Sequence, residues 1–566
     1  MSYLYTKTMS ETSLGIEKSD LVLKNGFVIN VFTNEIIKCD IAIQDGIIVG
    51  LGQYNGKNEI DVEGKYICPG LIDSHLHMES TLVNPAQLVH SAGLYGTTTF
   101  IVDPHEAANV SGKEGIDFIL EQTEGLQANV FVMIPSCVPA TDFEDNGYTL
   151  DATDMQEYLN NPRVLGLGEV MDCKSVLAAD EKMIEKLKLF QHKTIDGHAG
   201  YLSDKQTACY SLAGIKTDHE CCDFNTALLE MRNGIQILIR EGTAAKNLDA
   251  IINGVIEKNI PTNKLSFCTD DKHIEEIDKM GHISFNVKKA ISLGLNPIEA
   301  IKIATINSAS CYGLKNIGAI APGYQADMVI VPDLNNFTVE KVFYMGNEIK
   351  KEEPCILTKP INEKLLKTVN IGPISAESLK LKLLSDQTTI INIIGGQILT
   401  QRRIEKVKVL DGLFVADEVY NKVAVFERHH ATGKRGIGIV KGFAIKNGAI
   451  ASTVCHDSHN VIVIGDNDRD MILAVQELID CGGGYTIVEN GKKFMSLELE
   501  IMGLISSEPH GIINEKLKKM LQKAHEMGVE NDIDPFITLS FLALPVIPEV
   551  RITARGVFDV LKEQFL

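Results

Sequence analysis

The sequence predicts an α/β protein built on a (β/α)8 TIM barrel, with a small β-sandwich domain and a C-terminal α/β domain. Eight apolar, β-branched runs each end in a polar cluster and are followed by a helix-like stretch. Short β runs rich in turn residues flank this region, and the residues beyond it mix strand and helix patterns. Eight alternating βα units are the number that closes a barrel, and a doubly wound open sheet is the alternative fold.

The N-terminal segment begins with polar residues 1–20, which we expect to be loosely ordered. Short β runs follow, separated by turn residues. The dipeptides Asn25-Gly26 and Asp45-Gly46 are typical of hairpin turns, because asparagine, aspartate and glycine tolerate the positive φ angles that such turns require. These runs predict at least four strands of a small β unit.

The barrel strands come next, and the domain boundaries follow from the changes of pattern. The predicted strands cover residues 70–80, 97–106, 130–140, 164–172, 193–200, 214–220, 235–243 and 265–271. The expected domains are 1–73 (first part of the β-sandwich), 74–317 (barrel), 318–365 (returning part of the β-sandwich, ending in a linker) and 366–566 (C-terminal α/β domain).

The composition limits the classes of partner. Lys and Arg number 54 and Asp and Glu number 75, giving a net charge of −21, which disfavours nucleic acids and anionic membranes but not a neutral small molecule. The first twenty residues lack the apolar segment of a signal peptide, and no apolar run of about eighteen residues predicts a membrane span. With 12 scattered cysteines expected to be reduced, the sequence predicts a cytoplasmic protein.

Metal-binding side chains recur at the ends of the predicted strands. They are His75, His77, Glu169, His198, His219 and Asp270. His75 and His77 lie two residues apart in a strand, so their side chains point the same way. Six such ligands exceed the needs of one tetrahedral zinc ion with an open position, and they suit two divalent ions that share a carboxylate and a hydroxide. Six unrelated polar residues are the simpler alternative, but their common register favours a metal site.

Several motifs carry a resemblance to a known family. They are PGLIDSHLH, HMES, VDPHE, SCVPA, GLGEVMD, DGHAG, DHE, IREGTAAKNL, FCTDD and APGYQADMVI. In this order they resemble the metal-dependent amidohydrolase superfamily, and within it the bacterial adenine deaminase family, over nearly the whole chain. The resemblance implies hydrolysis of adenine to hypoxanthine and ammonia in purine salvage, by a metal-bound hydroxide. It implies two divalent ions, manganese or iron with zinc also allowed, and it permits a homo-oligomer.

The resemblance also implies a role for each ligand. The assignments are His75 and His77 for the more buried ion, Glu169 as the bridge, His198 and His219 for the second ion, and Asp270 as a ligand that takes the proton of the hydroxide. Many relatives carry a carboxylated lysine where this chain has Glu169. Asp103 and Asp271 would lie beside the purine ring, and Glu220 is the candidate proton donor.

A second polar cluster, CHDSHN at residues 455–460, lies outside the barrel region. By composition, His456, Asp457 and His459 could bind a metal. The simpler interpretation is a loop packed against the mouth of the barrel or a subunit contact. A capping role near the active site is a further hypothesis, which requires the loop to lie near His75 and Asp270.

Two other functions remain open at this point. One is a hydrolase of cyclic amides, or of another ring amine, on the same scaffold. The other is a metal-binding scaffold that has lost catalysis, which the intact Asp270 and His75-x-His77 pattern disfavours.

Overall fold

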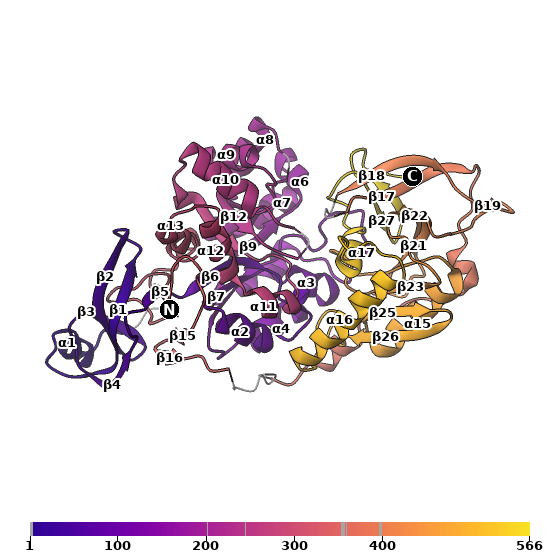
Figure 1. The fold of residues 1–566 in the computed structure, drawn as a ribbon. Helices are drawn as coiled ribbons and strands as arrows, with labels where there is room; N and C mark the ends of the chain where they lie inside the picture. Colours follow the sequence, from indigo (N-terminus) through magenta and orange to yellow (C-terminus); the bar gives the residue numbers. More distant parts are fainter. Residues whose placement is uncertain (1–3, 201, 244, 352–356, 358, 396–398) are drawn as a thin grey trace.

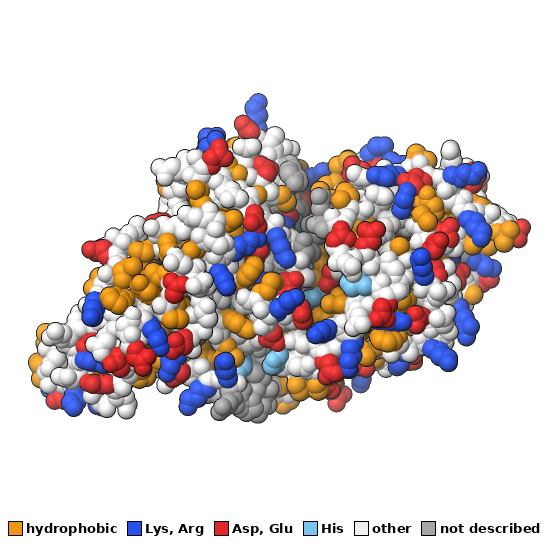
Figure 2. Space-filling view, viewed as in Figure 1, with side chains coloured by type: hydrophobic (Ala, Val, Ile, Leu, Met, Phe, Trp, Pro, Cys, Tyr) orange, Lys and Arg blue, Asp and Glu red, His pale blue; other side chains and the backbone are white. Residues whose placement is uncertain are grey.

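The computed structural model describes residues 4–566 apart from 201, 244, 352–356, 358 and 396–398. Figure 1 shows the N-terminal strands at one end, the parallel strands and their helices in the middle, and the C-terminal part at the other end. Among the described residues, no helix is long and apolar enough to span a lipid bilayer. Figure 2 shows acidic and basic side chains interspersed over one face, so the net negative charge is not gathered into a single patch there.

The N-terminal sheet joins segments from both sides of the barrel region. Its strands are β1 (Ser19–Asn30), β2 (Glu35–Gln44), β3 (Ile47–Gly52), β4 (Gly56–Asp61), β5 (Tyr66–Pro69), β14 (Met328–Val331), β15 (Lys341–Tyr344) and β16 (Asn347–Glu348). β14 pairs antiparallel with β5, so the returning segment completes the sheet begun at the N-terminus.

Two expectations for this region are wrong. Residues 7–13 form helix α1 (Lys7–Ser13), because the Thr6 side chain caps its first turn and Met9 packs against the sheet. Asn25-Gly26 is not a hairpin turn but lies within β1 at a register shift, where a Cβ on Gly26 would approach Ile67 Cδ1 to 2.4 Å. The dipeptide Asp45-Gly46 does connect two antiparallel strands, β2 and β3.

Eight parallel strands coincide with the eight predicted runs. They are β6 (Leu71–Leu76), β7 (Thr97–Val102), β8 (Asn129–Ile134), β9 (Val164–Val170), β10 (Thr194–Gly197), β11 (Thr217–Asp218), β12 (Gln236–Arg240) and β13 (Leu265–Cys268). The first five form one sheet and the last three another. Backbone hydrogen bonds cross both seams: Asp270 N–H donates to His75 O at 3.0 Å, and Lys216 N–H donates to Ile195 O at 3.0 Å. The strands therefore form a strongly curled parallel arrangement.

Helices surround these strands (Figure 1). The longer ones are α2 (Pro85–Leu94), α3 (His105–Ser111), α4 (Lys113–Gln122), α7 (Glu181–Leu189), α8 (Asp204–Leu212), α9 (Phe224–Arg232), α10 (Leu248–Lys258) and α12 (Ile283–Ser292). Every residue of β6, β7 and β8 is buried, so these strands do not alternate between apolar and polar residues.

The C-terminal part is built on a second large sheet. Its strands are β17 (Gln387–Ile393), β18 (Thr400–Lys406), β21 (Tyr420–Phe426), β22 (Arg435–Lys441), β23 (Gly448–Ser452), β24 (Val461–Gly465), β25 (Gly484–Glu489) and β26 (Lys492–Glu498). Helix α15 (Asp468–Cys481) packs against this sheet, and α16 (His510–Glu526), α17 (Pro535–Phe541) and β27 (Val550–Thr553) follow.

Ion pairs and hydrogen bonds hold this C-terminal part against the barrel strand ends. Arg555 Nε lies 2.9 Å from Asp145 Oδ2, and Lys434 Nζ lies 2.7 Å from Asp145 Oδ1. Farther along the contact, Gln87 Nε2 donates to Glu508 O at 2.9 Å. The mouth of the curled sheet is therefore covered by residues that come much later in the chain.

Candidate metal centre

The structure brings all six predicted ligand residues together at the carboxyl ends of the parallel strands. His75 lies in β6 with His77 just beyond it, Glu169 lies in β9, and the others directly follow β10, β11 and β13. Because these strands run parallel, residues far apart in the sequence meet at one end of the sheet. Five of the six are buried, and His198 is partly exposed.

Glu169 lies between two pairs of histidines. Its Oε1 is 3.2 Å from His77 Nε2 and 3.5 Å from His75 Nε2. Its Oε2 is 2.7 Å from His198 Nδ1 and 3.4 Å from His219 Nε2. Each carboxylate oxygen thus faces its own pair of imidazoles, as a bridging ligand of two metal ions would.

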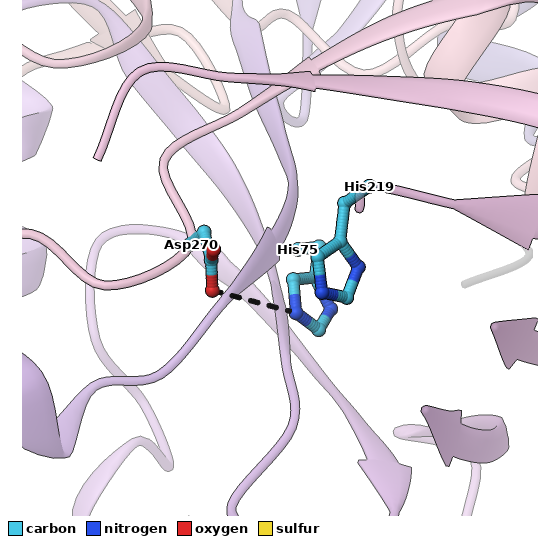
Figure 3. A group of neighbouring side chains, drawn as sticks. All are labelled: His75, His219 and Asp270. Atoms are coloured by element: carbon cyan, nitrogen blue, oxygen red, sulfur yellow. Dashed lines mark ion pairs between the residues drawn. The ribbon is translucent and has the colours of Figure 1, made fainter. Parts of the chain in front are cut away.

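Asp270 completes the cluster from the opposite side. Its Oδ1 lies 3.3 Å from His77 Nε2 and 4.0 Å from His75 Nε2, the contact drawn in Figure 3. The same view shows the rings of His75 and His219 lying one above the other, with centroids 4.3 Å apart. Ligand atoms of His75, His219 and Asp270 are close enough to share one ion.

The unpaired atoms of this cluster fit a metal centre. Among the described residues, Glu169 Oε1 and both ring nitrogens of His75 are buried without a hydrogen-bond partner. Leaving a buried polar group unpaired costs about 1–3 kcal/mol, so several such atoms aimed at one point indicate a missing ligand. His77 Nδ1 donates to Asp103 O at 2.9 Å, which leaves the lone pair of Nε2 free to bind a metal. Burial lowers the pKa of His75 to about 4, which favours the neutral, metal-binding imidazole.

Arg240, at the end of β12, is a residue that the sequence analysis did not single out. Its Nη1 lies 2.5 Å from Glu220 Oε1 and 2.6 Å from Asp270 Oδ2, and all three groups are buried or nearly so. Burial opposes the charged carboxylate, but Arg240 and nearby histidines lower the pKa of Asp270 well below its usual value. Arg240, and to a smaller extent His198, also lower the pKa of Glu220. Both carboxylates are therefore ionised at neutral pH.

The predicted substrate residues lie in different places. Asp271 lines the cavity at the metal centre and accepts a hydrogen bond from Ser80 Oγ. Asp103 does not line that cavity, because its Oδ2 accepts the backbone N–H of Glu169 at 2.8 Å and its side chain is fully buried. Asp103 thus holds Glu169 and His77 in position from behind.

A small cavity lies against the ligand cluster, and both halves of the protein line it. The C-terminal part contributes His456, Asp457, Phe541, Leu544 and Ile547. The loop at residues 455–460 therefore lies at the cavity, as the capping hypothesis requires.

His105, in α3 directly after β7, was also missed from the sequence. Its Nδ1 lies 3.3 Å from Glu169 Oε1, and its Nε2 lies 3.7 Å from Asp457 Oδ1. His105 and Arg240 both follow the pattern of polar residues at strand ends, so that pattern could have identified them.

Comparisons with known proteins agree with this geometry. The amidohydrolase family model matches residues 66–349, and the model of the adenine deaminase C-terminal domain matches residues 397–564. An adenine deaminase of Desulfitobacterium hafniense is 54% identical over 560 residues, covering 99% of this chain and 98% of that protein. An adenine deaminase of Clostridium acetobutylicum is 47% identical, covering 98% of this chain and 99% of that protein.

Solved structures align over the first part of the chain. The crystal structure of enamidase, an amidohydrolase superfamily member, aligns with a TM-score of 0.46 and 18% identity, over 58% of this chain and 96% of that one. The family assignment rests on the sequence matches, which extend over nearly the whole length. The chain belongs to the adenine deaminase family of metal-dependent amidohydrolases.

Proposed function

We propose that this protein hydrolyses adenine to hypoxanthine and ammonia at a binuclear metal centre, as a step of purine salvage. The observation that carries the proposal is the position of Glu169, whose two carboxylate oxygens each face a separate pair of histidines. The names of the full-length relatives supply the substrate. We further infer that the eight parallel strands form a complete (β/α)8 barrel, flanked by the other expected domains. The barrel begins with β6 at Leu71, three residues before the expected boundary at residue 74.

The proposed ligands are divided between the two ions. They are His75 and His77 for one ion, His198 and His219 for the other, Glu169 for both, and Asp270 for one of them. Manganese or iron is the expected metal, with zinc also allowed, since imidazole and carboxylate suit all three. When bound, such ions lower the pKa of a coordinated water so that it is a nucleophile at neutral pH.

The side chains of this protein then direct the protons. Asp270 is held ionised by Arg240, so it can accept the proton of the attacking water and pass it to the departing amine. Asp271, at the cavity wall, can accept a hydrogen bond from the purine. Glu220 must first gain a proton before it can donate one, because Arg240 holds it as a carboxylate. We therefore assign it as a proton carrier.

The test is ammonia release from adenine by the purified protein. Metal is removed with a chelator and restored as Mn²⁺, Fe²⁺ or Zn²⁺, and metal per chain is counted. We expect turnover to disappear and then to return as occupancy approaches two ions per chain. Guanine and hydantoins are run in parallel. Turnover of one of these instead of adenine would move the assignment to another ring substrate, and absence of all turnover with metal bound would favour a non-catalytic scaffold.

A further inference from the structure

A carboxylate with one unpaired oxygen lies on the cavity wall in the C-terminal part. Asp457 lies in the loop between β23 and β24, lines the cavity, and is 1% exposed. Its Oδ1 lies 3.7 Å from His105 Nε2 and 3.6 Å from His456 Nδ1. Among the described residues, its Oδ2 is buried with no hydrogen-bond partner. A buried, unpaired acceptor on a cavity wall is stabilised when a molecule in the cavity donates a hydrogen bond to it.

The neighbouring cluster of Glu106, His456 and His459 does not fit a further metal site. The three residues are close enough to share an ion. However, Cys455 N–H donates to His459 Nδ1 at 3.2 Å, so the neutral ring carries its proton on Nε2. That nitrogen lies 3.7 Å from Glu106 Oε2, which is beyond hydrogen-bond distance. With its proton on Nε2 and its Nδ1 already bonded, the neutral His459 ring has no free lone pair for an ion.

The other walls of the cavity suit a flat heteroaromatic ring. Met171, Leu544 and Ile547 supply apolar surface, and Phe541 stacks on His456 with ring centroids 4.5 Å apart. Asp271 and Asp457 add polar groups to the same cavity wall.

The His105 ring lies between Asp457 and Glu169 of the candidate metal centre. One ring nitrogen of His105 lies 3.3 Å from Glu169 Oε1, and the other lies 3.7 Å from Asp457 Oδ1. Asp457 is thus one imidazole ring away from the bridging carboxylate. In the pose assumed below, C6 of the purine lies at the metal ligands and its five-membered ring lies on the side of Asp457.

We propose that Asp457 Oδ2 accepts the N–H of the five-membered ring of adenine, and that the C-terminal part thereby selects the free base over the nucleoside. The inference rests on the proposed function and adds a specificity residue to it. A nucleoside carries its sugar on N9 and has no N–H in its five-membered ring, so it would leave Asp457 Oδ2 without a hydrogen-bond donor. A site built to bond a substrate N–H rejects analogues that lack it.

The experiment compares adenine with 9-methyladenine, which has no N–H in the five-membered ring. kcat/KM is measured for both in the wild type, Asp457→Ala and Asp457→Asn. We expect Asp457→Ala to reduce kcat/KM roughly ten- to hundredfold for adenine, the worth of a hydrogen bond to a charged group, and less than threefold for 9-methyladenine. Asp457→Asn keeps an acceptor oxygen and should lie between the two.

The matched control is Asp145→Asn, another carboxylate at the contact between the two halves. Asp145 pairs with Arg555 and does not line the cavity. The Asp145→Asn variant should change kcat/KM for adenine and for 9-methyladenine by the same factor. Calorimetric binding of hypoxanthine and 9-methylhypoxanthine gives the same comparison for any folded variant that turns over too slowly.

Two results would overturn the inference. One is an equal loss for adenine and 9-methyladenine in Asp457→Ala. The other is wild-type turnover of adenosine comparable to that of adenine, because the sugar would then have a place of its own. Failure of the wild type to deaminate adenine would instead refute the proposed function, so the two failures are distinguishable.

Discussion

Replacing Arg240 with methionine tests whether one buried cation holds two carboxylates at the metal centre. Arg240 Nη1 lies 2.5 Å from Glu220 Oε1 and 2.6 Å from Asp270 Oδ2, and the arginine side chain is 5% exposed. Methionine keeps much of the volume and removes the charge. The variant leaves two ionised groups in a buried site without their shared partner.

The size of the effect follows from these distances. At an effective dielectric constant of about 20, each contact is worth about 6 kcal/mol of Coulomb attraction. Desolvation of the three groups offsets most of it, and removing one partner of a buried pair typically destabilises by about 3–5 kcal/mol. We expect a loss of that size from the free energy of unfolding of the metal-free protein. With metal bound the loss should be smaller, because the ions offer Asp270 a replacement positive charge.

The assay is urea denaturation followed by circular dichroism, with and without Mn²⁺. The control is Arg403→Met, whose partner Glu405 lies 3.9 Å away at a half-exposed site. An exposed pair contributes about 0–1 kcal/mol, so the control should stay close to the wild type. A loss below about 1 kcal/mol in metal-free Arg240→Met would show that the two carboxylates do not depend on this arginine.

Three further changes test the site and the contact between the two halves. Glu169→Gln should lower the metal content by one or both ions, and full two-ion occupancy measured by elemental analysis would refute the bridging role. Asp270→Asn should reduce kcat far more than metal content, whereas complete metal loss would mean that Asp270 acts mainly as a ligand. Asp145→Asn tests a pH dependence: although burial opposes ionisation, Arg555 and Lys434 lower the pKa of Asp145 in the folded state. The stabilisation is therefore present above the unfolded pKa of about 3.9 and lost as the pH falls through the lower folded value. The difference in Tm between wild type and Asp145→Asn should accordingly shrink as the pH is lowered below 4, and a constant difference would contradict this assignment.

The parallel strands, and the clustering of His75 and Asp270 at their ends, could be predicted from local patterns. Residues 97–102 are buried on both faces and consist of β-branched and apolar residues, so this run stands out from the alternating strands nearer the N-terminus. Parallel strands then place every strand end on the same side of the sheet. That geometry predicts that His75 and Asp270 meet, although 195 positions separate them (270 − 75).

The other features of the fold and the site depend on contacts between distant parts of the chain, which no local sequence pattern indicates. His105 faces Asp457 across the two halves of the chain, and nothing near either residue in the sequence indicates the other. The position of Asp103 behind Glu169 depends on which way one carboxylate turns at the end of β7. Helix α1 was missed because its stability comes from Met9 packing against the β-sheet, whereas its sequence is mostly polar.

The order of the cavity residues along the chain has a consequence for synthesis. The ribosome completes the six proposed metal ligands by residue 270, but Asp457 and Phe541 of the cavity wall are added only later in translation. A nascent chain, or one shortened by a premature stop codon, would have the residues to bind metal without an enclosed place for the base. Metal capture and substrate recognition are thus separated in time by the order in which this polypeptide is made.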